Sequence, residues 1–289
     1  MKDDTTMTLR SLLAKMTDHE GLNFVLTNYV PRRTLTTLAG HIAKIEQPLI
    51  RDISIAVWRQ FSDLDLSEAK KSSFTSLHDC FIRELKDGAR PVDRRPELLV
   101  SPSDGIVGTS GQIADGVMLQ VKGSIYPLAE LVRDEQLLAA YRNGTYVTLR
   151  LTASMYHRFH APHDCTVTNL SHIAGDTWNV NPPALKRVPR LFCRNERAVV
   201  QLTLAEGLHR VTLVPVAAIA VACIRLNFAE LPRDRQHAGP WSTLCSAPFS
   251  KGQEMGWFEH GSTIICSPRP VSNCVRRSRA GCDCAWGSH

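Results

Sequence analysis

From about residue 98 onward the chain consists of short β-prone runs, and this pattern constrains the fold more than any other feature. Runs such as "TYVTLRLT" and "AVVQLTLAEGLHRVTLVPV" have the length of strands and are bounded by Gly, Pro, Asn or Asp. The segments "YRNG" and "AEG" between runs are typical of turns. Because runs joined by tight turns favour antiparallel pairing, we predict a mainly antiparallel β-sheet domain behind a helical front, an α+β fold.

Residues 8–75 form this front and have the pattern of helices. The segment "RRTLTTLAGHIAKIE" places four apolar residues on one helical face, beside Arg and Lys: Leu35, Leu38, Ile42 and Ile45. Such a helix either packs on the protein's own core or lies in a membrane interface. The 12-residue apolar run 213–224 is shorter than the ~20 residues that span a bilayer. We therefore expect peripheral attachment at most.

The net charge and the cysteine pattern do not single out one class of function. A formal charge of +6 suits an anionic membrane or nucleic acid and by itself predicts neither. The cysteine count is nine, an odd number, and five of the cysteines are scattered singly, as reduced thiols usually are. The tail run "CDC" lacks the residue spacing of zinc motifs, so we expect no metal site.

Two polar clusters could carry chemistry. Asp104 lies in "SPSDGIV", where Asp-Gly alone indicates only a turn. His157, His160 and His163 lie in "YHRFHAPHD", but their spacing suits neither one helical face nor one strand face. A three-histidine metal site is therefore disfavoured, and each histidine taken alone is as well explained by a structural role.

The third candidate is the Gly261-Ser262 bond in "FEHGSTIIC". It is either an ordinary turn into a last strand or a reactive serine. The serine lacks the G-x-S-x-G pattern of α/β-hydrolases, which disfavours that class. A serine that attacks its own preceding peptide bond needs no such pattern, only a strained turn and a histidine base oriented by a carboxylate. The pattern therefore also allows a self-cleavage site.

Several long stretches in this order are similar to the phosphatidylserine decarboxylase proenzymes, the pyruvoyl-dependent bacterial type. These stretches are "FIRELKDGARPVD" (81–93), "SPSDG" (101–105), "KGSIYPLAELV" (122–132), "YHRFHAPHDCTV" (156–167), "VNPPALKRVPRLFCRNER" (180–197), "VTLVPV" (211–216) and "KGQEMGWFEHGST" (251–263). The resemblance covers about residues 30–266.

The resemblance implies a maturation triad of Asp104, His160 and Ser262. His160 takes the proton of Ser262, Asp104 holds the imidazole, and Ser262 attacks the Gly261 carbonyl. Cleavage leaves a large chain (1–261) and a small chain (262–289) whose first residue is a covalent pyruvoyl group derived from Ser262. This group serves as the Schiff-base electrophile for phosphatidylserine, the electron-sink role that a cofactor fills elsewhere.

The resemblance also implies the surroundings of the reaction. His157 matches the family's other active-site histidine and is expected to handle a proton, whereas His163 has no match and is expected to be structural. The substrate is phosphatidylserine in an anionic membrane, the product is phosphatidylethanolamine, and the protein is peripheral at the cytoplasmic face of the cell membrane. A heterodimer of large and small chains is implied, further dimerisation is left open, and no nucleic acid is involved.

The resemblance divides the chain into a helical membrane-associating region (1–75), a β-rich catalytic domain (76–266) and a divergent, disordered tail (267–289). His260 stands where the family has an aliphatic residue. Three further departures replace Gly, Gly and Ser of relatives: Ala217, Ala222 and Cys223. The altered tail keeps one alternative open, a non-processing and inactive membrane-binding relative. A pyruvoyl decarboxylase of soluble amino acids is the other rival.

Overall fold

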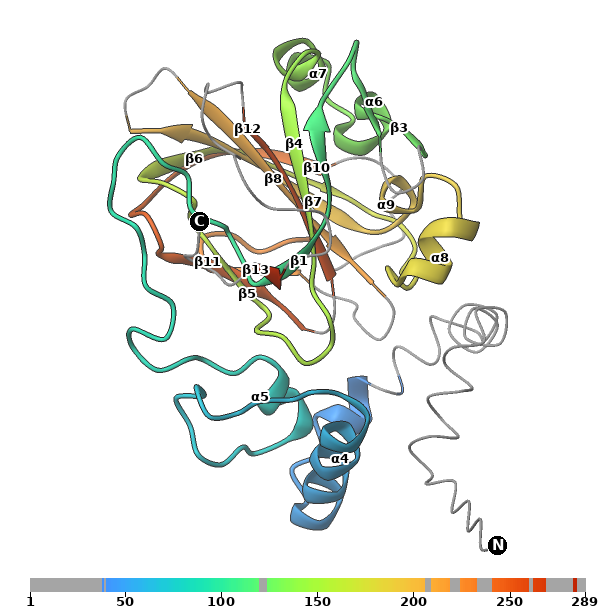
Figure 1. Cartoon of the computed structure of the whole chain (residues 1–289), viewed down its shortest axis with the longest axis vertical. Helices are drawn as coiled ribbons and strands as arrows, with labels where there is room; N and C mark the ends of the chain where they lie inside the picture. Colours follow the sequence, from blue (N-terminus) through green and yellow to red (C-terminus); the bar gives the residue numbers. More distant parts are fainter. Residues whose placement is uncertain are drawn as a thin grey trace, which may run out of the picture.

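The computed structural model describes most of the chain. The described residues are 38, 40–119, 124–205, 209–218, 224–232, 241–259, 262–268 and 283–284. Figure 1 shows a large β-sheet body with a helical segment beneath it. None of the helices among the described residues is long and apolar enough to cross a membrane.

Within the described residues, one antiparallel sheet contains eight strands. Their spatial order is β10 (Trp241–Phe249), β6 (Cys165–Ile173), β7 (Arg197–Leu204), β8 (Arg210–Ala217), β12 (Ser262–Pro268), β4 (Thr145–Arg150), β1 (Gly105–Gln112) and β13 (Asp283–Cys284). A second sheet has the order β5 (Arg158–His160), β11 (Glu254–Phe258) and β9 (Ile224–Leu226), and β2 (Val117–Leu119) pairs with β3 (Ile125–Pro127). The α+β, mainly antiparallel fold predicted from the sequence is confirmed.

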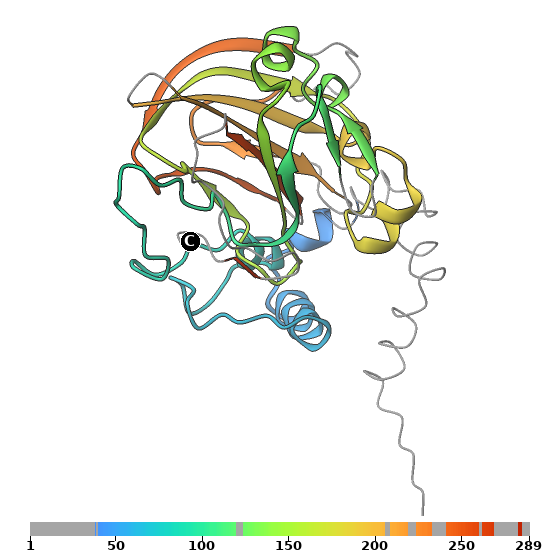
Figure 2. The same ribbon diagram turned by 45° about the horizontal axis from the view of Figure 1, so that its top comes forward.

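The main sheet is covered on both faces. The helices α6 (Leu128–Val132), α7 (Glu135–Tyr141), α8 (Pro182–Arg187) and α9 (Leu191–Arg194) pack on one face. The β5-β11-β9 sheet packs on the other. Successive side chains of strand β12 point to opposite faces of the main sheet. Ile264 packs in the hydrophobic cluster beneath the small sheet, and Ile265 packs in the cluster beneath the helices. Figure 2 shows these layers from a second direction.

The helical front is only partly helical where it is described. α4 (Pro48–Phe61) has Pro48 at its first position and the side chain of Gln47 as its N-cap. Residues 62–75, expected to be helical, form turns and loops instead. The carboxylate of Asp65 accepts from the Ser67 backbone, the kind of local bond that competes with a helix. Of the predicted apolar face, Leu38 and Ile42 are exposed and Ile45 is half-buried, whereas Leu35 lies outside the described residues.

At Gly256 the strands of the second sheet approach too closely for a side chain, so replacing it by Ala should destabilise the protein. A Cβ there would lie 2.1 Å from the Arg225 carbonyl oxygen and 2.9 Å from the ring of Phe159. We expect Gly256→Ala to lower the free energy of unfolding by about 1–3 kcal/mol, measured by urea denaturation. Gly108→Ala is the matched control, since its Cβ would meet nothing closer than 3.6 Å. Equal losses in both variants would contradict this packing argument.

Candidate active site

The strand register brings the segments of the predicted maturation triad to one end of the main sheet. Arg150 of β4 pairs with Ile106 on one side and with Thr263 on the other. Asp104 and Ser262 therefore flank the same end of β4, and their backbones lie roughly 10 Å apart, twice the usual strand spacing. A histidine positioned near this end can bridge that gap with its side chain.

His160 comes to this end from β5. Its backbone N–H donates to the Pro102 carbonyl at 2.7 Å, which ties it to the loop that carries Asp104. The ring is 5% exposed; Nδ1 lies 3.1 Å from the Gly252 carbonyl oxygen and Nε2 3.1 Å from the Tyr156 hydroxyl. Burial lowers the pKa of His160 to about 3, so the ring is neutral. A carbonyl only accepts, so we infer that Nδ1 carries the proton and that Nε2, which faces the Tyr156 hydroxyl, is the basic nitrogen.

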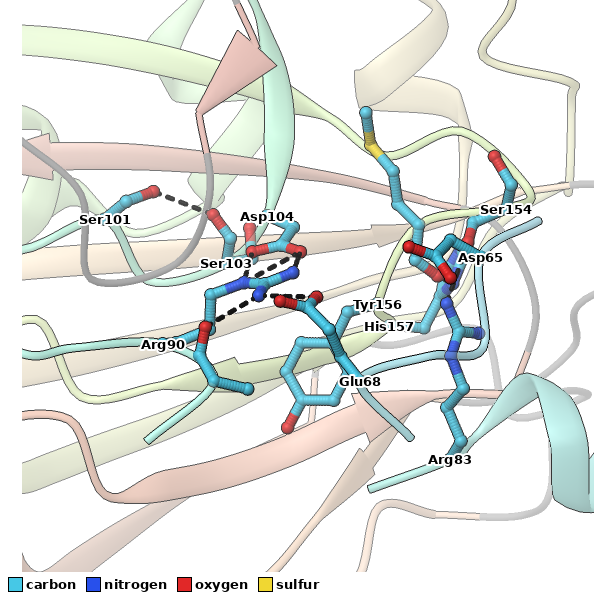
Figure 3. A network of polar contacts seen from close by, with 12 residues as sticks. Asp65, Glu68, Arg83, Arg90, Ser101, Ser103, Asp104, Ser154, Tyr156 and His157 are labelled. Atoms are coloured by element: carbon cyan, nitrogen blue, oxygen red, sulfur yellow. Dashed lines mark hydrogen bonds and ion pairs between the residues drawn. The ribbon is translucent and has the colours of Figure 1, made fainter. Parts of the chain in front are cut away.

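The Asp104 carboxylate is fixed by an arginine fork. Arg90 donates from Nε to Oδ1 at 3.0 Å and from Nη2 to Oδ2 at 2.8 Å, a bidentate geometry. Its Nη1 donates to Glu68 and to the Ala89 carbonyl, each at 2.8 Å. Figure 3 shows this network beside Tyr156 and His157. The bond to Asp104 raises the pKa of Arg90, so the guanidinium is permanently charged.

The other two histidines of the cluster make different contacts. His157 is fully buried, with Nδ1 2.8 Å from the Met155 carbonyl oxygen and its ring centroid 4.0 Å from that of Phe81. His163 contacts main-chain oxygens of Pro96 and Asp164 through its two ring nitrogens. Anchoring by two loops suits the structural role expected for His163. Among the described residues, no group of His, Cys, Asp or Glu side chains is arranged to hold a metal ion.

The predicted cleavage site lies at the start of a central strand. The backbone of Ser262 pairs with Ala217 of β8, and Thr263 follows between β8 and β4. Thr263 is fully buried, and its hydroxyl has no hydrogen-bond partner among the described residues. Gly261 and His260 lie outside the described residues, and of Ser262 only the backbone is described.

Ala217, one of the departures noted in the sequence, lies opposite Ser262 in the strand pair. It is fully buried, its N–H donates to the Glu196 carbonyl and its carbonyl accepts from Asn195, both at 2.8 Å. The alanine methyl group is therefore accommodated in a tightly bonded β8 end. Ala222 and Cys223 lie outside the described residues.

Sequence reasoning missed four groups around this site. Arg83 and Arg90 were quoted within a matching stretch but given no role, and Tyr156 and the Gly252 carbonyl were not identified as contacts of His160. The available signal was the pair of arginines in "FIRELKDGARPVD", an unusual density of charge beside Phe and Ile.

Comparisons with known proteins identify the family of this chain. A sequence profile of the phosphatidylserine decarboxylase family matches residues 77–279. The chain is 34% identical over 244 residues to a phosphatidylserine decarboxylase proenzyme of Haemophilus influenzae, covering 82% of this chain and 83% of that protein. The proenzyme of Aliivibrio fischeri is 34% identical over 256 residues, with 85% and 88% covered. That of Myxococcus xanthus is 34% identical over 244 residues, with 83% and 86% covered.

The fold is α+β, and near one end of its main sheet lie a buried histidine and a carboxylate held by an arginine. The profile match and these identities show the family, and the chain belongs to the phosphatidylserine decarboxylases.

The buried neutral state of His160 should make the protein acid-sensitive. In the unfolded chain a histidine binds a proton near pH 6.5, whereas folded His160 does so only near pH 3. Stability from this group is therefore fully present above pH 6.5 and is lost as the pH falls toward 3. Between pH 7 and pH 5 we expect a loss of about 2 kcal/mol that His160→Gln does not show.

The measurement is urea denaturation at both pH values, with Ser262→Ala in both chains so that neither is cut. The same pH dependence in the two chains would contradict the buried neutral imidazole.

Proposed function

We propose that this chain is a self-cleaving proenzyme that forms a pyruvoyl group at residue 262 and decarboxylates phosphatidylserine to phosphatidylethanolamine. The observation that carries the proposal is a neutral, buried imidazole whose backbone is bonded to the loop of Asp104, near the end of β4 that Asp104 and Ser262 flank on opposite sides. Membership of the family supports the same activity. The comparisons give no support to the alternative of an inactive membrane-binding relative.

Maturation would use the chain's own residues. His160 Nε2 accepts the proton of the Ser262 hydroxyl, and Oγ attacks the Gly261 carbonyl carbon, so that an ester replaces the peptide bond. Loss of the Ser262 α-proton then breaks the Cβ–Oγ bond, which releases Gly261 as a carboxylate and leaves dehydroalanine. One water converts this residue to pyruvoyl and releases ammonia. General-base help of this kind is typically worth about 10²–10⁴-fold in rate.

The residues around position 262 fit a carbonyl group at that position. The neighbouring Thr263 hydroxyl is buried without a hydrogen-bond partner among the described residues, so a donor is available beside the new ketone and its amide. The pyruvoyl group would supply an electron sink for the electrons released as carbon dioxide leaves. Large (1–261) and small (262–289) chains would form the active heterodimer.

His157 is the group we assign to proton handling during decarboxylation. Its Nδ1 faces the Met155 carbonyl oxygen at 2.8 Å, which fixes the proton on Nδ1 and directs Nε2 to the opposite side of the ring. The Thr152–Met155 turn follows β4 directly, so the ring is held near the end of the strand that Ser262 flanks. An imidazole oriented in this way can take up a proton on Nε2 and pass it to the carbon that loses carbon dioxide.

Helix α4 supports peripheral attachment at the cytoplasmic face of the cell membrane. Leu49, Ile53 and Val57 are spaced by four residues, lie on one face and are 64%, 54% and 49% exposed. The other side of the helix packs inward, with the Trp58 ring 5.6 Å from that of Phe81. An exposed apolar stripe with adjacent basic residues suits the interface of an anionic bilayer that contains phosphatidylserine.

Self-cleavage is tested by the intact mass of denatured protein. We expect purified wild-type protein to give two species, residues 1–261 and a 28-residue fragment, 262–289, that begins with pyruvoyl. Ser262→Ala should remain a single chain of 32.1 kDa, and His160→Gln should slow cleavage by about 10²-fold or more. Ser250→Ala, at an exposed serine on the same part of the chain, is the matched control and should cleave normally.

A wild-type chain that stays uncut would overturn the proposal, as would a fragment that begins with unmodified serine. A matured protein that decarboxylates free serine but not phosphatidylserine would instead favour the rival decarboxylase of soluble amino acids.

Membrane attachment is tested by removing the stripe on α4. We expect the combined change Leu49→Gln, Ile53→Gln and Val57→Gln to lower the partition coefficient onto phosphatidylserine-containing vesicles by roughly a hundredfold, because three apolar side chains no longer enter the interface. The measurement is co-sedimentation with vesicles. Gln60→Ala, at an exposed polar position of the same helix, should bind like the wild type. Unchanged binding of the triple variant would exclude this stripe as the attachment surface.

A further inference from the structure

Arg83 is a buried cation, and two of its donor groups have no acceptor among the described residues. The residue follows helix α5 (Leu77–Phe81) and is only 6% exposed. Its Nη2 donates to the Ser154 carbonyl at 2.8 Å, whereas Nε and Nη1 are buried and have no hydrogen-bond partner among the described residues. Burial lowers the pKa of Arg83, and the nearby Cys80, Asp104 and Asp65 oppose that effect.

A second buried arginine shows that a guanidinium can be buried in this protein with acceptors for its donor groups. Arg197 is fully buried, and its guanidinium donates to the carbonyl groups of Leu131, Cys193, Asn195 and Glu130 at 2.6–2.8 Å. Arg197 therefore needs no ligand. Arg83 keeps two buried donors that have no acceptor within the part of the chain that the structure describes, and such a donor requires an explanation such as a ligand.

The place of Arg83 relates it to the proposed active site. The Ser154 carbonyl that it contacts precedes the Met155 carbonyl that holds His157 Nδ1. Both carbonyls belong to the turn after β4, the strand end that Asp104 and Ser262 flank. Figure 3 shows the Arg83 guanidinium near Ser154 and His157, on the other side of Tyr156 from the Arg90–Asp104 pair. Arg90 is occupied by carboxylates, whereas Arg83 Nε and Nη1 have no acceptor among the described residues.

We propose that Arg83 binds the phosphodiester of the phosphatidylserine headgroup through Nε and Nη1, an inference that rests on the proposed function. The fork of a guanidinium matches two oxygens of a phosphate. The headgroup also carries a carboxylate, but its negative charge disappears as carbon dioxide forms. An arginine on the carboxylate would stabilise the substrate more than the transition state and would slow the reaction. The phosphate keeps its charge throughout, so binding it positions the substrate without that penalty.

The test uses matured protein and soluble short-chain lipids. Dihexanoyl phosphatidylserine is the substrate, and dihexanoyl phosphatidylethanolamine, which has the phosphate but no carboxylate, is the inhibitor. We expect Arg83→Gln to raise both KM and the inhibition constant by about ten- to a hundredfold, with a smaller change in kcat. Arg83→Lys should give an intermediate loss in both. Arg142→Gln, at an exposed arginine in a remote turn, is the matched control and should resemble the wild type.

Each other outcome has a defined meaning. A raised KM with an unchanged inhibition constant would place Arg83 on the carboxylate and overturn the proposal, as would unchanged values for both. Inhibition by inorganic phosphate as strong as that by the lipid would indicate a free-phosphate site and also overturn it. If neither Arg83→Gln nor Arg83→Lys matures, Arg83 serves folding or cleavage and the proposal is wrong. Failure of the wild-type chain to mature or to decarboxylate would instead count against the proposed function.

Discussion

The arrangement of the site depends on the pairing of β12 on both of its edges. This strand inserts between β8 and β4 in the middle of the main sheet, although it comes from the end of the chain. Thr263, Ile264 and Ile265 are almost completely buried. A cut before Ser262 would leave the strand hydrogen-bonded on both sides and packed on both faces. The small chain therefore has a physical means of staying bound after cleavage, even though the tail beyond it departs from the family pattern.

The same pairing explains why charges gather at one end of the sheet. Strand ends are where side chains can leave the packed layers, and Asp104, the turn with the Ser154 and Met155 carbonyls, and Ser262 lie beside this end of β1, β4 and β12. The Arg90 fork fixes the orientation of the Asp104 carboxylate. The imidazole of His160 is kept neutral by burial.

The sequence predicted the class of fold and the runs that form β1 to β4, β7, β8 and β12, because strand length and turn residues are local properties. It predicted no spatial order of strands and did not identify β5, β6, β9, β11 or β13. It did not predict β10, whose residues "WSTLCSAPF" alternate between half-buried and exposed positions and include Pro248. The family resemblance supplied the candidate residues, but not their contacts. Tyr156, Gly252 and Arg90 reach the site across up to 92 residues of sequence, and such contacts follow from register and packing that no local pattern encodes.

A line of aromatic contacts connects the proposed membrane helix to the proposed catalytic histidine. Trp58 of α4 stacks on Phe81, with ring centroids 5.6 Å apart, and Phe81 packs on His157 at 4.0 Å. Arg83 follows two residues after Phe81, so one short segment positions both a ring against His157 and a cation beside it. Close-packed contacts of this kind resist small displacements. The orientation of α4 is thereby fixed relative to the proposed active site, as entry of a headgroup from a bilayer bound at α4 would require.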